Sequence, residues 1–211
     1  EVVKELKTFV KTLDVTKPDD AQAMLESLWV FEEHRVPNFE LIQTLYKANE
    51  PRVRAAAIRT LGHWGTQIEG WEPVLIAASA DESPLVRAEA VKSAVAFSGV
   101  TSAEVVFNVA TQPTDVELDV VIKYALSQIP VDKLLQEVMR SKGKLSPAAR
   151  KYALKNSSPE DLLAYEQSAE VYEAILSRTN TPVNSLRQAL NGFAELQKSN
   201  PASLLMKLMA E

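Results

Sequence analysis

Three prolines stand 33 residues apart, at Pro18, Pro51 and Pro84, and the segments that follow the last two nearly repeat each other. The sequence Pro-Arg-Val-Arg-Ala-Ala-Ala-Ile at 51–58 aligns with Pro-Leu-Val-Arg-Ala-Glu-Ala-Val at 84–91. A fixed period of about 30 to 50 residues is typical of stacked similar units, each of which buries its apolar face only against its neighbours. The period therefore predicts a solenoid rather than one globular core.

Apolar residues recur at helical spacing along nearly the whole chain. Leu6, Phe9, Val10 and Leu13, for example, follow the i, i+3, i+4, i+7 pattern of one helix face. No stretch shows the sustained alternation of a strand. We therefore predict an all-α fold, an α-solenoid of about six helical pairs plus one terminal helix. The expected ranges are 2–13 with 18–33, 38–48 with 51–64, 71–80 with 84–97, 102–111 with 115–128, 131–141 with 146–155, 159–178 (interrupted) with 182–197, and 201–210 alone.

Prolines also mark where helices are expected to begin, because the first helical position needs no backbone N–H. Small polar residues precede five of these prolines, where an N-cap belongs. The expected N-caps are Ser83, Ser146, Ser158, Thr181 and Asn200.

The composition narrows the classes of function. Asp and Glu number 28 against 23 Lys and Arg, giving a net charge of -5, so nucleic acid is not an expected partner. The chain has no cysteine, which excludes thiol nucleophiles, Cys-ligated zinc and covalent haem attachment within these residues. No apolar run is long enough to predict a membrane span. We expect no catalytic residue, no cofactor and no metal ligand.

Two segments, Glu50–Gly62 and Asp81–Val91, resemble the HEAT repeat. In each, proline opens a helix, and valine and alanines let neighbouring helices approach closely. Arg54 and Arg87 occupy the same place and are suited to bridge acidic groups or carbonyls of an adjacent repeat. Such contacts form a ladder that connects neighbouring repeats. The resemblance gives the acidic role in this ladder to the aspartate that opens the second segment. Ala48 stands at the matching place one repeat earlier, so the ladder is expected to be incomplete.

A narrower resemblance rests on the order of several motifs. They are Leu25–Val30, Arg54–Leu61 with Trp64, Asp81 with Val86–Val91, and Asp115. Over roughly residues 18–190 this succession is similar to the helical region of PVC-type haem-binding CxxCH proteins, which are large exported bacterial proteins. In that family a sorbosone-dehydrogenase-like propeller precedes the helical region and a c-type cytochrome domain follows it.

This resemblance implies a role and a setting for the chain. Residues 1–211 would be a single HEAT-like domain, excised from a larger exported or periplasmic bacterial protein. The domain itself would be a non-catalytic, monomeric scaffold whose partners are flanking domains of the parent chain or another protein. Leu204, Leu205, Leu208 and Met209 on the unpaired last helix support this expectation, because they would need a partner.

Five basic residues fall on second helices of neighbouring pairs and would form a basic stripe if that face is a groove. They are Arg52, Arg54, Arg59, Arg87 and Lys92. We interpret Arg54 and Arg87 as members of the packing ladder, and the other three as solvated. Interleaved glutamates dilute the positive charge.

The aromatic and histidine residues leave alternatives open. Trp29, Trp64 and Trp71 would form either a binding surface or, as we favour, filling between repeats with hydrogen-bonded indole N–H groups. His34 and His63 would bind a metal only if they converged with carboxylates such as Glu32, Glu33 or Glu69.

A second hypothesis for the function comes from another class of protein. Alkylpurine DNA glycosylases also use HEAT-like repeats, and Trp64, Trp71 and Asp115 are the residues such an activity would need. The acidic composition argues against it.

Overall fold

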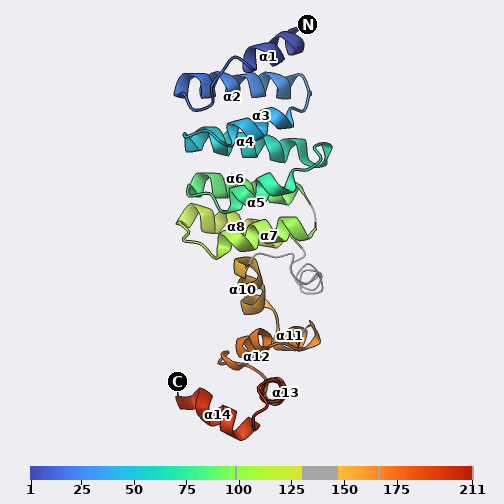
Figure 1. Ribbon diagram of the computed structural model, residues 1–211. Coiled ribbons are helices and arrows are strands. Elements are labelled where there is room, and N and C mark those ends of the chain that lie inside the picture. The colour runs from blue at the N-terminus through green and yellow to red at the C-terminus, as the bar shows by residue number, and fades with distance from the viewer. Residues whose placement is uncertain (98, 130–146, 166, 211) are drawn as a thin grey trace. The chain divides into compact units, whose positions relative to one another are not determined.

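The computed structural model describes residues 1–97, 99–129, 147–165 and 167–210, in which every regular element is helical. The expected all-α fold is therefore confirmed for this part of the chain. Its contacts divide it into two compact units, Glu1–Val131 and Asp132–Glu211 (Figure 1). We call them the first and the second unit and describe each by itself. Whether residues 1–211 form a single repeat domain stays a prediction.

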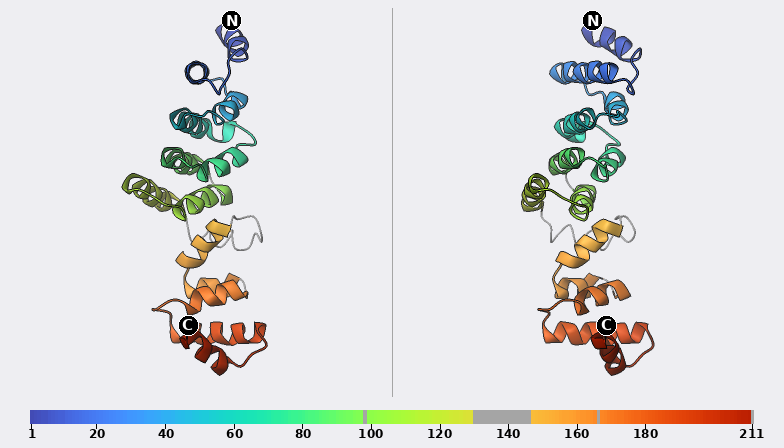
Figure 2. Two further views of the ribbon diagram at one scale, coloured as in Figure 1. Left: turned by 60° about the vertical axis from the view of Figure 1, so that its left-hand side comes forward. Right: turned by 90° about the vertical axis from the view of Figure 1, so that its left-hand side faces the viewer.

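The first unit consists of stacked helical pairs. Its elements are α1 (Val2–Val10), α2 (Pro18–Glu33), α3 (Phe39–Leu45), α4 (Pro51–Trp64), the 3-10 turn η1 (Gly65–Gln67), α5 (Glu72–Ser79), α6 (Pro84–Ala96), α7 (Val100–Ala110) and α8 (Val116–Gln128). Each odd-numbered helix contacts the even-numbered helix that follows it. Figure 2 shows α2, α4, α6 and α8 in one layer and α3, α5 and α7 in the other. We call the even-numbered members the second helices.

The second helices begin in the same way. Pro18, Pro51 and Pro84 are the first residues of α2, α4 and α6, as predicted. At the start of α8 an aspartate cap replaces the proline. The Asp115 carboxylate accepts a hydrogen bond of 2.7 Å from the backbone N–H of Leu118, which satisfies a donor that the helix itself leaves unpaired.

Close contact between second helices depends on small residues. A Cβ atom added at Gly62 of α4 would lie 2.5 Å from Oγ of Ser93 on α6. That Oγ donates a hydrogen bond of 2.9 Å to the carbonyl of Ile58, so it joins the two helices. Large apolar side chains fill the space between the layers and are fully buried. They include Leu28, Phe31, Ile42, Leu45, Ile58, Leu61, Leu75 and Val86.

The second unit contains five described helices. They are α10 (Pro147–Asn156), α11 (Pro159–Tyr165), α12 (Ala169–Leu176), α13 (Val183–Leu196) and α14 (Pro201–Ala210). Its core is centred on the contact between α12 and α13, where the rings of Tyr172 and Phe193 lie 6.5 Å apart. Gly192 allows a close contact there, because an added Cβ would come too close to the end of the Tyr172 side chain unless the ring shifts.

The predicted helix ranges agree closely with the structure. The interrupted helix expected over 159–178 is present as α11 and α12, and Ser168 caps α12 by accepting from the N–H of Val171 at 3.4 Å. The helix expected over 131–141 lies outside the described residues, whereas its expected partner is present as α10. Within the described ranges, no helix is both long and apolar enough to span a membrane.

The predicted N-caps have mixed outcomes. The side chains of Ser158 and Asn200 accept hydrogen bonds from the N–H groups of Asp161 (3.0 Å) and Ala202 (2.8 Å), as expected of caps. Ser83 occupies an N-cap position, but its side chain makes no capping bond. Thr181 was wrongly predicted, because its hydroxyl donates back to the carbonyl of Ile175 at 3.2 Å and Pro182 takes the N-cap position. Ser146 lies outside the described residues.

Candidate functional site

Two arginines hold the loops of successive repeats in place. Arg54 and Arg87 are the fourth residues of α4 and α6. Nη1 of Arg54 donates to the carbonyls of Ala48 and Asn49, each at 3.0 Å. Nη1 of Arg87 donates to carbonyls at the same two places in its own loop, residues 81 and 82, at 2.9 and 3.0 Å. Each arginine therefore closes the loop of its own helical pair.

The two arginines differ in what they reach in the next repeat. Nε and Nη2 of Arg54 donate to the two carboxylate oxygens of Asp81, both at 2.9 Å, and the side chains are only 9% and 7% exposed. This hydrogen bonding raises the pKa of Arg54. Arg87 instead donates through Nη2 to the carbonyl of Pro113 at 2.8 Å, and its buried Nε finds no partner within the described residues. The contact of Arg54 with the next repeat is therefore an ion pair, whereas that of Arg87 is a hydrogen bond to a backbone carbonyl.

One side of the second helices carries a regular row of exposed side chains. The ninth residues of α2, α4, α6 and α8 are all exposed, and we call them the ninth-residue row. They are Glu26, Arg59, Lys92 and Tyr124. The tenth residues are buried and small, so the exposed row runs directly beside the line along which the second helices touch. These buried residues are Ser27, Thr60, Ser93 and Ala125.

A buried glutamate fixes the two cations in the middle of this row. Glu89, whose side chain is 3% exposed, accepts from Nε and Nη2 of Arg59 at 3.1 and 3.0 Å and from Nζ of Lys92 at 2.9 Å. Burial by itself would raise the pKa of Glu89, but the hydrogen bonds and charges of Arg59 and Lys92 outweigh it and lower that pKa. The cations remain 55% and 52% exposed. From the sequence alone, Arg59 and Lys92 are interpreted as solvated. In the structure both are half-exposed and are also hydrogen-bonded to Glu89.

A shallow groove of about 360 Å³ lies over this cluster. Its lining residues come from α4 and α6. They are Arg59, Gly62, His63, Glu89, Lys92, Ser93 and Ala96. Beside it, Nδ1 of His63 lies 2.6 Å from a carboxylate oxygen of Glu32 on α2. The groove thus combines charged side chains, fixed by hydrogen bonds to Glu89, with the small residues Gly62 and Ala96.

The structure does not bring the histidines together at a metal site. Within the described residues, no three His, Asp or Glu side chains are grouped so that they could hold a metal ion. His63 meets a single carboxylate, that of Glu32, whereas His34 is an exposed residue at the C-terminal cap of α2. The interactions that these side chains make are charge pairing and hydrogen bonding.

The tryptophans take different places. Trp64 is 7% exposed, and its indole Nε1, expected to be hydrogen-bonded, has no partner in the described part of the chain. Trp71 stacks on Phe97 with ring centroids 3.8 Å apart. Trp29 is 46% exposed at the α2 position that corresponds to Gly62 in α4. Trp64 and Trp71 thus act in packing and Asp115 in capping, and the glycosylase hypothesis for these three residues stays a hypothesis.

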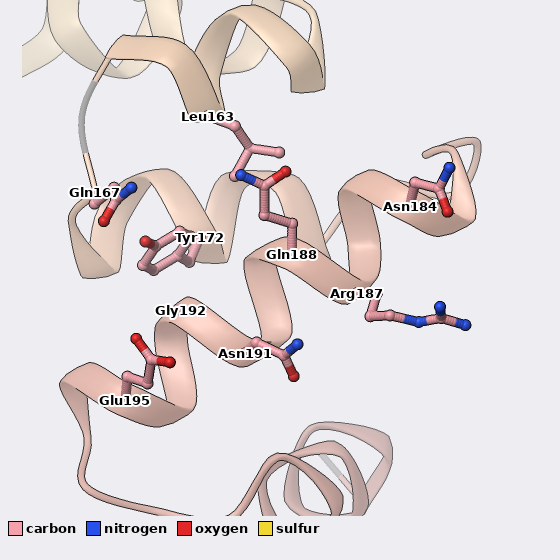
Figure 3. Close-up of a pocket in the computed structure, with 9 residues that line it drawn as sticks. All are labelled: Leu163, Gln167, Tyr172, Asn184, Arg187, Gln188, Asn191, Gly192 and Glu195. Atoms are coloured by element: carbon pink, nitrogen blue, oxygen red, sulfur yellow. The ribbon is translucent and has the colours of Figure 1, made fainter.

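The second unit contains a pocket of about 370 Å³ that sequence reasoning missed (Figure 3). It is rich in side-chain amides, contributed by α13 and by the segment before α12. These amides are Gln167, Asn184, Gln188 and Asn191. A signal was available, because positions 184, 188, 191 and 195 have the i, i+4, i+7, i+11 spacing of one helix face. Neutral amides carry no chemistry that draws attention in a sequence.

Comparison with known proteins gives a match within the first unit. Residues 39–123, which span α3 to α7 and most of α8, match the family model for HEAT repeats. This match supports a HEAT-repeat helical fold, and such repeats are generally non-catalytic scaffolds for protein interaction. No curated protein and no solved structure matches the chain significantly.

Proposed function

We propose that this chain is a non-catalytic interaction module that binds a protein partner through the ninth-residue row of its first unit. The observation that carries this proposal is the Arg59–Glu89–Lys92 cluster. A buried carboxylate costs free energy unless it is paired, and here it orients two cations that stay half-exposed on neighbouring helices. Their side chains are held in place before a partner arrives, which reduces the entropy lost on binding.

The chemistry of the row defines the partner. Two cations share one buried carboxylate, so the centre of the groove keeps a net positive charge and favours acidic groups. Nη2 of Arg59 and Nζ of Lys92 contact the same oxygen of Glu89, at 3.0 and 2.9 Å, so the two charged groups lie no more than about 6 Å apart. In an extended chain, side chains two residues apart lie on the same face, about 6.6–6.8 Å from each other. Two acidic side chains two residues apart would therefore face Arg59 and Lys92 together. Within the row, Glu26 of α2 precedes Arg59 and Tyr124 of α8 follows Lys92. The exposed ring of Tyr124 suits an apolar or aromatic side chain of the same segment.

A displayed library of random peptides, selected on the whole chain, tests the proposal. We expect enrichment of peptides with two acidic residues two positions apart, since side chains at this spacing lie on one face of an extended chain. The Arg59→Ala/Lys92→Ala variant should lose these peptides. Arg52→Ala is the matched control, because Arg52 is an exposed cation of α4 outside the row. Equal recovery on all three proteins would contradict the proposed surface.

We propose further that the module works, as a monomer, within a larger exported bacterial protein of the dehydrogenase–cytochrome type, in the periplasm or outside the cell. The ordered motifs of Leu25–Val30, Arg54–Leu61 and Val86–Val91 support this setting through their resemblance to the PVC-type family. Sequencing the complete gene tests it, with an export signal, an upstream propeller and a downstream CxxCH motif as the expected result. The purified chain should reduce no dye with sugar or alcohol substrates, and substrate-dependent reduction would contradict a non-catalytic role.

A further inference from the structure

The amide-rich pocket of the second unit carries an inference of its own. Asn184, Gln188 and Asn191 form a stripe along one face of α13, which we call the amide stripe (Figure 3). All three side chains are exposed, and none makes a hydrogen bond to another described residue. Gln167 faces them across the pocket with the same free amide chemistry.

The floor of the pocket adds a hydrogen-bonding group. The Tyr172 ring packs against Gly192 and is 4% exposed. Burial, together with the carboxylate of Glu195, raises the pKa of the Tyr172 hydroxyl, so the group stays protonated and can donate. Because the ring itself is covered, no aromatic face is available for stacking, as sugar recognition commonly requires.

Side-chain amides match the polar groups of a peptide main chain. Each amide offers both N–H donors and a carbonyl acceptor, and a main chain presents the same two groups in every residue. Asn184, Gln188 and Asn191 follow one another at axial steps of about 6 and 4.5 Å, given a rise of 1.5 Å per residue. An extended peptide repeats every two residues, at about 6.6–6.8 Å, which these flexible side chains can follow.

Two opposite charges line the same pocket, with Arg187 beside the stripe and Glu195 beyond its C-terminal end. Arg187 lies toward the N-terminal end of α13 and Glu195 toward its C-terminal end, and they point to opposite sides of the pocket (Figure 3). Eight helical residues separate them by about 12 Å along the axis, which an extended peptide covers in about three to four residues. A segment with one acidic and one basic side chain at this distance complements both charges.

We propose that the amide stripe of α13 binds an extended peptide segment through its main chain, with an acidic side chain of the peptide at Arg187 and a basic one at Glu195. This inference rests on the proposed interaction function, but it concerns a different surface and a different peptide motif. The match between neutral amides and a neutral main chain explains why the centre of the pocket carries no charge. The charges of Arg187 and Glu195 set the direction of the bound segment.

The same displayed library, selected on the whole chain, tests this site separately. We expect a second class of peptides, with an acidic and a basic residue about three to four positions apart. Gln188→Ala and Asn191→Ala should each weaken synthetic peptides of this class about three- to tenfold, as expected for one lost hydrogen-bonding group. N-methylation of the peptide main chain should weaken binding likewise. Gln197→Ala is the matched control, an exposed amide just beyond α13 and outside the pocket.

A charge reversal gives the sharpest outcome. The Arg187→Glu/Glu195→Arg variant should select peptides in which the acidic and basic residues have exchanged order. Absence of this class, or binding unaffected by Gln188→Ala and Asn191→Ala, would overturn the inference, as would binding of neutral oligosaccharides alone on a glycan array. Peptides that depend only on Arg59 and Lys92 would leave the proposed function standing while this site fails, whereas recovery of neither class would sink both.

Discussion

The two units use the same kind of helix but hold it in place differently. In the first unit, the arginines at the fourth position of α4 and α6 each reach their own loop, and Arg54 also pairs with the buried Asp81 of the next repeat. In the second unit, Arg178 donates to the backbone carbonyls of Leu154 and Ser157 and, within the described residues, to no carboxylate. A periodic sequence can reuse one side-chain contact from repeat to repeat, whereas the second unit depends on contacts that occur once.

The first prediction compares these arginines and has the largest expected effect. Arg54→Ala should lower the free energy of unfolding of the first unit by about 3–5 kcal/mol, because it leaves the buried carboxylate of Asp81 unpaired. Arg178→Ala should cost the second unit about 1–3 kcal/mol, the usual penalty for leaving carbonyls without a donor. Hydrogen exchange followed by mass spectrometry measures both, since it reports on each unit separately. The exposed Arg52→Ala provides the baseline, and equal losses for Arg54→Ala and Arg178→Ala would contradict the difference between the units.

The second prediction compares two close helix contacts. Gly62→Ala forces a Cβ against the buried Ser93, whose Cβ and Cα also lie close, at 2.8 and 3.0 Å. We expect a loss of about 1–3 kcal/mol from overpacking, even though alanine favours a helix over glycine by about 1 kcal/mol. Gly192→Ala meets the end of the Tyr172 ring, which can turn toward the pocket, so its cost should stay below about 1 kcal/mol. Thermal unfolding of each variant measures the difference, and a larger loss for Gly192→Ala would reverse the comparison.

The third prediction concerns the charge cluster of the first unit. Glu89→Gln should lower stability by about 1.5 kcal/mol at neutral pH, because charge-assisted hydrogen bonds from Arg59 and Lys92 are lost. The folded state lowers the pKa of Glu89, so its contribution is complete above the ordinary value of 4.5 and is lost as the pH falls through the lowered pKa. Urea unfolding of both proteins from about pH 7 to about pH 3 should therefore show the difference shrinking in acid. A difference that does not change with pH would mean that the charge of Glu89 contributes nothing.

How much the sequence could predict also differs between the units. The 33-residue period located the second helices of the first unit and the equivalence of Arg54 and Arg87, because one helix turn and one loop repeat almost unchanged. It did not reveal the role of Glu89. Its pairing with Lys92 spans three residues, but its pairing with Arg59 spans 30 and exists only because α4 and α6 pack together. From the sequence alone, Glu89 was interpreted only as a negative charge that reduces the net positive charge of the basic stripe.

In the second unit the helices were predictable but their contacts were not. Proline and serine signals placed the starts of α10 and α11, and an interruption within 159–178 was expected, although its position before Ser168 was not. The packing of Gly192 against Tyr172 joins α13 and α12, which are not related by a sequence repeat. No sequence pattern therefore predicts this contact. The Asn184–Asn191 face had helical spacing, yet only its position at the edge of a pocket gives it meaning.

The last prediction compares two serine caps and has the smallest expected effect. The Ser158 hydroxyl accepts from the N–H of Asp161 at 3.0 Å and donates to its carboxylate at 2.7 Å, so Ser158→Ala should cost the second unit about 1 kcal/mol. The Ser83 hydroxyl makes no capping bond, and its N–H donates to the Asp81 carboxylate at 2.9 Å, a contact that alanine keeps. Ser83→Ala should therefore leave the first unit unchanged within about 0.3 kcal/mol. Hydrogen exchange in α6 and α11 measures both effects. A loss at Ser83 as large as that at Ser158 would show that the Ser83 hydroxyl also stabilises the start of α6. The Asp81 carboxylate, which already pairs with Arg54, would then not be sufficient there.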